Sequence, residues 1–279
     1  MLLMDTRFRG ARSLIVCFSG TGNTWTLSRA IAKGLSDNGV QTDVLAMEQA
    51  SEPLDITGYS IIGIGFPVFV GSIPANVYRW VRKLPSGQGR KTFIFSTKGG
   101  GTFGSEALLA FLLAKRGYRV VAGKSFFAPC NDGMLIGTED MNDPAVARKF
   151  TDLDPLGESW AKGILEGSAT LEKNTASWKL FAALFGLLFR YSIQFHIDFL
   201  TDFYLKADKR CSGCGLCERI CPTGNIQGSL EKPRFGTRCV LCERCLNYCP
   251  VKSIHFLLSP LRPQYRAPGF KPPVLRKAT

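Results

Sequence analysis

Two copies of one cysteine spacing constrain this chain more than any other feature of its sequence. Each copy reads C-x2-C-x2-C-x3-C-P, and a short segment separates them. Three thiolates at C-x2-C-x2-C spacing suit one cubane iron–sulfur cluster, and the cysteine before proline ligates the other cluster when two are present. The spacing therefore predicts one [4Fe-4S] centre on Cys211, Cys214, Cys217 and Cys249, and a second on Cys239, Cys242, Cys245 and Cys221.

Zinc and disulfide bonds account for these cysteines less well. A structural zinc ion needs only four ligands, so the third cysteine of each run would be unused. Disulfide bonds are typical of secreted proteins, and no secretory signal is evident between Met1 and Arg12. Free thiols and oxygen-sensitive clusters suit a reducing compartment, so we expect a cytoplasmic protein.

The positive charge of the chain is concentrated in its C-terminal part. The formal net charge is +13, of which +3 belongs to residues 1–170 and +10 to residues 171–279. Two oxidised [4Fe-4S] centres, each with a net charge of about −2, offset part of it. The remainder favours an acidic partner, through encounter rate more than affinity. No aromatic-interleaved basic motif or nucleic-acid fold signature is present, so we expect no nucleic-acid binding.

The first predicted strand ends in a loop suited to an anion. The apolar run Leu14–Phe18 leads into the loop 19–24, and a helix with apolar residues at four-residue spacing follows. Backbone N–H groups at the start of a helix favour a phosphate. The loop has neither the lysine of a Walker motif nor G-x-G-x-x-G spacing. Its sequence, SGTGNT, resembles the S-x-T-G-N-T pattern that flavodoxins use for the FMN phosphate.

Strands and helices alternate through the rest of the first half. Further strands are predicted at Thr42–Ala46, Ser60–Gly65, Thr92–Ser96 and Arg119–Phe127. Helices are predicted at Ile73–Leu84, Ser105–Arg116 and Ala145–Gly163. This α/β alternation implies a doubly wound parallel sheet with its ligand at the carboxyl ends of the strands. Together with the resemblance of the first loop to flavodoxins, it implies a flavodoxin-like sheet of five strands. A small α+β domain with the two clusters follows it.

Two more loops, Gly65–Gly71 and Thr97–Phe103, leave the same edge of the predicted sheet. In flavodoxin-like proteins these loops hold the isoalloxazine ring. The alternative interpretation is that Phe66 and Phe69 only anchor a loop. The resemblance assigns FMN binding to Ser19, Thr21, Gly22, Asn23, Thr24, Pro67, Val68, Phe69, Gly71, Thr97, Lys98, Gly99, Gly100 and Gly101.

Lys98 and Asn131 are the candidates for a direct role in the chemistry. The ring loops contain Lys98 and no acidic residue. A lysine close to the ring would stabilise the reduced anion and raise the flavin potential, whereas a solvated lysine would do neither. Asn131 follows the fifth strand and is expected to hydrogen-bond flavin or substrate. Its neighbour Cys130 is expected to be a small buried filler.

The sequence divides into four predicted parts. An FMN domain (1–168) is followed by an apolar and amphipathic helical connector (169–205), a two-cluster domain (206–258) and a basic, proline-rich tail (259–279). The uncharged stretch Leu180–Phe189 is shorter than the roughly 20 residues that span a bilayer. We expect the connector to pack against both domains, with peripheral membrane contact as the alternative. The tail is expected to be extended, wrapping the domain or meeting a partner.

As a whole the sequence resembles a flavodoxin–ferredoxin fusion family found mainly in anaerobic bacteria and archaea. The segment Asn247-Tyr248-Cys249-Pro250 after Cys242 and Cys245 is typical of that family's second motif. The resemblance implies FMN and two [4Fe-4S] clusters. It is compatible with an oxidoreductase that takes electrons from a low-potential donor, such as an acidic ferredoxin, and reduces a small organic acceptor at FMN. The alternative is an electron shuttle whose FMN edge serves a partner redox protein. The sequence leaves homo-oligomerisation open.

Overall fold

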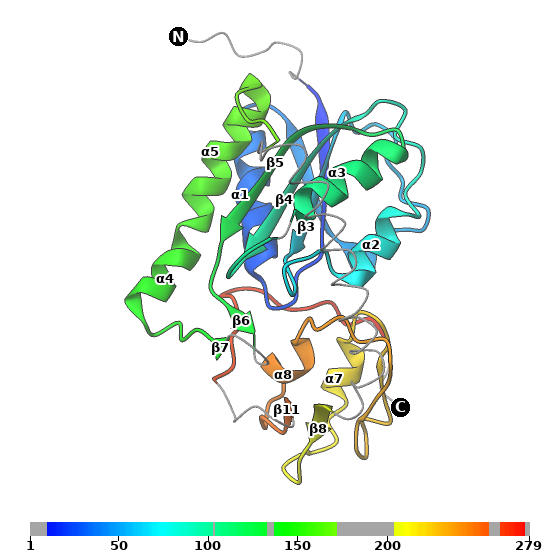
Figure 1. The fold of residues 1–279 in the computed structure, drawn as a ribbon, viewed down its shortest axis with the longest axis vertical. Coiled ribbons are helices and arrows are strands. Elements are labelled where there is room, and N and C mark those ends of the chain that lie inside the picture. Colours follow the sequence, from blue (N-terminus) through cyan, green and yellow to red (C-terminus); the bar gives the residue numbers. More distant parts are fainter. Residues whose placement is uncertain (1–9, 103, 133–136, 172–203, 257–262, 277–279) are drawn as a thin grey trace.

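A five-stranded parallel sheet forms the centre of the N-terminal domain (Figure 1). The computed structural model describes residues 10–102, 104–132, 137–171, 204–256 and 263–276. The strand order β2-β1-β3-β4-β5 is the doubly wound order of flavodoxin-like folds, which confirms the predicted fold class. The strands are β1 (Arg12–Cys17), β2 (Gln41–Ala46), β3 (Ile61–Pro67), β4 (Lys91–Lys98) and β5 (Arg119–Phe127).

Helices cover both faces of this sheet. One face carries α1 (Asn23–Asp37), α4 (Pro144–Thr151) and α5 (Leu153–Glu166), and the other carries α2 (Ala75–Val81) and α3 (Ser105–Lys115) (Figure 1). Successive residues of a strand point to opposite faces. Ile15 accordingly packs with the core of α1 and α5, whereas Leu14 and Val16 pack with that of α2 and α3. Both faces are apolar, which explains the nearly continuous apolar runs of the strands.

The predicted helix Ala145–Gly163 is two helices, which divide at Asp152. Pro155 explains the division. In a continuous helix its ring would clash with the carbonyl group of Thr151, four residues earlier. Pro155 is tolerated in the first turn of α5, where a backbone N–H is not needed.

The small domain consists of two similar halves. The antiparallel pairs β8 (Leu205–Ala207) with β11 (Ile254–Phe256) and β9 (Ile226–Gln227) with β10 (Arg234–Phe235) accompany two short helices, α7 (Leu216–Arg219) and α8 (Arg244–Asn247). The last cysteine of each run accepts an equivalent bond. Asn225 N donates to Cys221 Sγ at 3.2 Å, and Ser253 N donates to Cys249 Sγ at 3.3 Å. The repeat in the sequence is therefore a repeat in the backbone.

Residues 263–276 of the tail cross between the two domains (Figure 1). Ala267 N donates to Thr21 O, and Leu275 N donates to Arg219 O, both at 2.9 Å. The predicted connector lies mostly outside the described residues, which resume at residue 204. Among the described residues, no helix has the length and apolar character needed to cross a membrane.

One buried arginine joins the domains. Arg244 opens α8 and is 1% exposed. Its Nη2 and Nε donate to Ser19 O at 2.6 and 3.3 Å, and its Nη1 donates to Ile220 O at 3.3 Å. Nη2 also lies 2.5 Å from Glu48 Oε1, in the short helix η2 (Met47–Gln49). The guanidinium lies 5.2 Å from the centre of the Phe18 ring. The charge is thus buried with a partner from the other domain.

We expect the substitution Arg244→Leu to lower the free energy of unfolding by about 3–5 kcal/mol, because it leaves Glu48 buried without its counter-charge. Denaturant titration would measure this. Arg210→Leu is the matched control, since Arg210 forms a solvent-exposed ion pair with Asp208, and its loss should lower the free energy of unfolding far less than the loss of Arg244. Equal losses in the two variants would contradict the proposed importance of Arg244.

Candidate cofactor site

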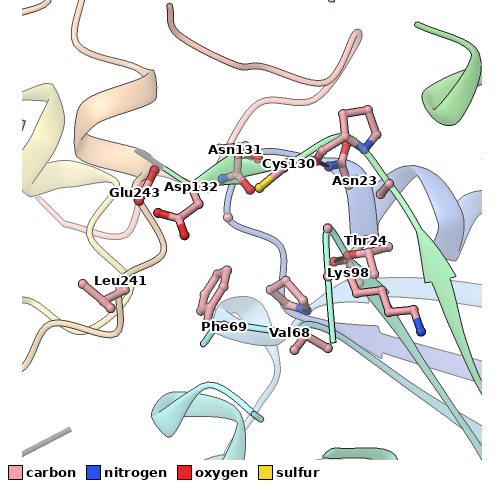
Figure 2. Close-up of a pocket in the computed structure, with 18 of the residues that line it drawn as sticks. Asn23, Thr24, Val68, Phe69, Lys98, Cys130, Asn131, Asp132, Leu241 and Glu243 are labelled. Carbon is pink, nitrogen blue, oxygen red and sulfur yellow. Dashed lines mark hydrogen bonds between the residues drawn. The ribbon is translucent and has the colours of Figure 1, made fainter. Parts of the chain in front are cut away.

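A cavity of about 370 Å³ lies at the carboxyl ends of β1, β3, β4 and β5. Its volume falls in the range of small-molecule and cofactor sites, roughly 300–1,000 Å³. Figure 2 shows the loops of the N-terminal domain on one side, with Thr24 and Lys98, and the small domain on the other, with Leu241 and Glu243. The cavity therefore lies where the sheet edge predicted a ligand, and the second domain closes one side of it.

The cavity gathers nearly all the residues assigned to FMN. Those that line it are Ser19, Thr21, Asn23, Thr24, Pro67, Val68, Phe69, Gly71, Thr97, Lys98, Gly99, Gly100 and Gly101. Gly22 is the exception. A methyl group at Gly22 would lie 2.5 Å from Ala267 Cβ and 2.7 Å from Phe270 Cβ, so this residue faces the tail.

The loop before α1 keeps the character of an anion site. Gly22 is the N-cap of α1, and no side chain caps the helix. The loop's carbonyl oxygens instead face the rest of the protein, since Ser19 O accepts from Arg244 and Thr21 O from Ala267. Uncapped N–H groups at a helix start favour a phosphate. The residues present therefore fit the phosphate end of FMN.

Asn23 does more than line the cavity. Its Nδ2 donates to Pro129 O at 2.8 Å, and its Oδ1 accepts from the hydroxyl of Tyr265 in the tail. Thr24 Oγ1 and Thr97 Oγ1 are similarly paired at 2.8 Å. These bonds hold the loops after β1, β4 and β5 in one arrangement. One Asn23 amide hydrogen stays available beyond the bond to Pro129.

The loop after β3 closes through a tight turn. Phe69 and Ser72 exchange two backbone hydrogen bonds of 3.0 Å around Val70 (φ 49°) and Gly71 (φ 71°). Phe69 lines the cavity and meets the Phe18 ring edge-on at 6.3 Å. Phe66, in contrast, is fully buried in the core. Of the two aromatic residues considered from the sequence, only Phe69 is placed to contact a bound ring.

Lys98 and Asn131, the two candidates for chemistry, are placed differently. Asn131 begins the short strand β6 (Asn131–Asp132), which pairs with β7 (Gly137–Thr138), and it lines the cavity. Lys98 Nζ lies 4.6 Å from the centre of the Phe127 ring, and Figure 2 shows the amine directed away from the other labelled side chains. This placement favours the solvated lysine over a lysine against the ring.

Two acidic residues at the cavity come from segments other than the ring loops. No sequence pattern predicts that these two residues lie at the cavity. Asp132 reaches the cavity from β6 and Glu243 from the second cysteine run. Cys130 also lines the cavity. Burial raises the pKa of its thiol, and the nearby carboxylates of Asp132, Glu139 and Glu243 add to the rise. Cys130 is therefore no ready thiolate.

The first cysteine run lies close to Cys249, the last cysteine of the second run. The pKa of the Cys217 thiol is raised to about 12, chiefly by burial and then by the neighbouring thiols of Cys214, Cys211 and Cys249. At Cys249 burial is outweighed, because bonds from the Ser253 hydroxyl and N–H lower the pKa of the thiol. The four thiols predicted for one cluster therefore lie within electrostatic reach of one another.

The second cysteine run lies close to Cys221, the last cysteine of the first run. The pKa values of Cys239 and Cys242 are raised to about 12, chiefly by burial, and Cys221 is among the other groups that raise them. The pKa of Cys245 is also raised, by burial and then by Cys242, Cys239 and Cys221. A metal centre would supply the counter-charge that such thiolates need. No three His, Cys, Asp or Glu side chains of the described chain are placed to hold a single metal ion.

The second cysteine group directly adjoins the cavity. A methyl group at Gly20 would lie 2.6 Å from Cys242 O, so only glycine admits this approach of the two loops. Leu241 and Glu243, on either side of Cys242, both line the cavity. Cys214 of the first group is exposed. One cysteine group thus faces the cavity, and the other reaches the surface.

Comparisons with known proteins match the two parts of the chain separately. A family model described as a 4Fe-4S binding domain matches residues 208–227, which contain the first cysteine run. No curated protein matches.

Three solved structures illustrate the structural similarity. A flavodoxin from the domain Archaea is 17% identical, with a TM-score of 0.40 over 55% of this chain and 98% of the other. The Megasphaera elsdenii flavodoxin is 22% identical, with a TM-score of 0.40 over 54% and 98%. Rubredoxin oxygen:oxidoreductase from Desulfovibrio gigas is 15% identical, with a TM-score of 0.39 over 57% and 37%. The fold assignment rests on the strand order and not on these values. The chain joins a domain with the strand order of flavodoxins to a 4Fe-4S binding domain, which is the combination that its sequence resembles.

Proposed function

We propose that this protein is an iron–sulfur flavoprotein oxidoreductase, with FMN in the cavity and two [4Fe-4S] clusters on the two cysteine groups. The observation that carries the proposal is the contact between the cluster loop and the cavity. Cys242 O abuts Gly20 of the anion loop, and the neighbours of Cys242 line the cavity. A cofactor in the cavity and a cluster on the second cysteine group would therefore be adjacent.

The second cluster is supported by the repeat. The family model covers only the first run. The second run has the same spacing, the same N–H to sulfur bond at its last cysteine, and an equivalent short helix. Cys221 lies with the second run and Cys249 with the first. These observations support two sets of four cysteines, one for each proposed cluster.

FMN is supported by the cavity itself. Its phosphate end fits the uncapped start of α1, and its ring end fits the loops that carry Phe69 and Gly99. When bound, FMN exchanges one or two electrons and so links one-electron clusters to two-electron chemistry. The protein's own residues bind and orient it. Asn23 and Thr24 tie the loops together, and Asn131 presents an amide to the cavity.

We propose that electrons arrive at the first cysteine group from an acidic, low-potential donor protein such as a ferredoxin. Cys214 is exposed, and Arg219 Nη2 donates to its carbonyl oxygen at 3.3 Å. Lys209 and Lys232 are both exposed. Lys209 lies two residues before Cys211, and Lys232 lies two residues after Leu230, whose carbonyl oxygen approaches Gly213 of this loop. Positive side chains of this kind accelerate encounter with an acidic protein. Free thiol ligands suit a reducing compartment, so we place the protein in the cytoplasm.

A small organic acceptor is the favoured outlet for the electrons. The segment 128–132 adds five residues to the cavity lining beyond those of the ring loops. A wall of this kind would shield a substrate next to the flavin from solvent, which an electron shuttle does not need. The alternative, a shuttle whose FMN edge serves a partner redox protein, is favoured by the basic character of the C-terminal part.

The electron acceptor can be identified with the anaerobic holoprotein. We would reduce it fully and follow flavin reoxidation by quinones, enones and nitro compounds, and by acidic ferredoxins and flavodoxins. An oxidoreductase should show fast, saturable reoxidation by one small-molecule class. Reoxidation by proteins alone, slowing as salt rises, would establish the shuttle instead. Reduction of the oxidised holoprotein by an acidic ferredoxin should slow with salt in either case, if the donor proposal is correct.

The number of clusters can be tested with two alanine substitutions. We expect Cys214→Ala and Cys242→Ala each to lose about half of the iron and of the cluster absorbance, because each removes one thiolate from a different [4Fe-4S] centre. The double variant should lose nearly all of both. Cys17→Ala is a control, since Cys17 lies buried in the core of the N-terminal domain. Unchanged iron in Cys242→Ala would refute the second cluster.

A further inference from the structure

The two cysteine runs share an unusual backbone conformation at three equivalent positions. In the first run these are Gly213 (φ 64°), Gly215 (φ 69°) and Gly224 (φ 64°). In the second run they are Leu241 (φ 54°), Glu243 (φ 54°) and Lys252 (φ 51°). Because the same conformation recurs at the same places, the cluster-binding backbone requires it.

Glycine is the low-strain residue for this conformation. Any residue with a Cβ is destabilised there by a contact between Cβ and the backbone. The first run has glycine at all three positions. The second run has residues with side chains at these positions, although the backbone conformation favours glycine. Strained residues of this kind are concentrated at functional sites, where the surroundings hold them in place.

Two of these three side chains lie at the same cavity. Leu241 and Glu243 both line the cavity, on the side that faces the small domain (Figure 2). Glu243 is 7% exposed, so it is enclosed by protein and not directed to bulk solvent. Lys252 is exposed and does not line the cavity. Backbone strain alone therefore does not indicate a function. Backbone strain in a residue that also lines the cavity does.

A third strained residue supports the same site. Val70, a β-branched residue at φ 49°, lines the cavity from the turn after β3. Such a conformation is a genuine outlier for a β-branched residue. Among the described residues other than glycine with positive φ, Val70, Leu241 and Glu243 line the cavity, whereas Gln88 and Lys252 do not.

We propose that Leu241 and Glu243 are flavin-positioning residues supplied by the cluster domain. This inference rests on the proposed function. Leu241 provides apolar surface for an aromatic ring system, and Glu243 provides an acceptor for a ring N–H group. An isoalloxazine has both features. The small domain thereby completes the flavin site in addition to holding the clusters.

Glycine substitutions separate this role from a structural one. We would measure the FMN dissociation constant and the denaturant midpoint of the cluster-loaded full-length protein for Leu241→Gly and Glu243→Gly. Each should weaken FMN binding at least about tenfold, through lost apolar burial or a lost charged hydrogen bond. Neither should lower the unfolding midpoint measured without FMN, because glycine relieves the strained backbone. Leu241→Met and Glu243→Gln should keep affinity within a few-fold of the wild type.

Lys252→Gly is the matched control, since it removes a side chain from the third equivalent position. It should leave the FMN dissociation constant unchanged. Unchanged FMN affinity in both Leu241→Gly and Glu243→Gly would overturn the inference, and so would an equal loss in Lys252→Gly. If the wild-type protein bound no FMN, the proposed function itself would fall. If the wild-type protein binds FMN and the two glycine variants bind it equally well, only the positioning role would be overturned.

Discussion

The burial of Arg244 is the constraint on which the joint between the two domains depends. A guanidinium removed from water must have its charge and its N–H groups satisfied. Here Ser19 O and Ile220 O accept its hydrogen bonds, and Glu48 balances its charge. Ser19 belongs to the anion loop and Glu48 to the segment after β2, so the arginine is satisfied only when the domains are docked. Because Arg244 lies between Cys242 and Cys245, the same contact holds the cluster loop against the cavity.

The two halves of the small domain have the same backbone and different surroundings. Where the first half has Gly213, Gly215 and Leu216, the second has Leu241, Glu243 and Arg244. These three residues reach the cavity or the anion loop, whereas their counterparts in the first half do not line the cavity. The first half instead leaves Cys214 exposed. The two copies of the motif therefore face different surroundings, one toward the cavity and the other toward solvent. Under the proposed function, electrons would enter at the exposed copy and leave through the copy at the cavity.

The sequence predicts best where local spacing determines the contact. The pairing of Cys249 with the first run follows from the repeated motif, and the meeting of the loops that carry Thr24, Phe69 and Thr97 follows from parallel strands that end at one edge. Contacts across domains were missed for a physical reason. Leu241 and Glu243 reach the cavity because the cluster loop docks on the N-terminal domain, a contact in which Arg244 takes part. Gly22 contacts the tail because residues 263–276 return between the domains. No local pattern specifies either event.

The charge at the cavity shows the same limit. The ring loops contain one lysine and no carboxylate, and the sequence leaves open whether that lysine lies beside the ring or is solvated. In the folded chain the Lys98 amine lies over Phe127, and Asp132 and Glu243 join the cavity from segments far away in the sequence. Carboxylates near a ring disfavour additional negative charge on it, whereas a lysine would favour it. Under the proposed function, these carboxylates would disfavour an anionic reduced flavin, and would thereby favour transfer of its electrons to an acceptor over their retention.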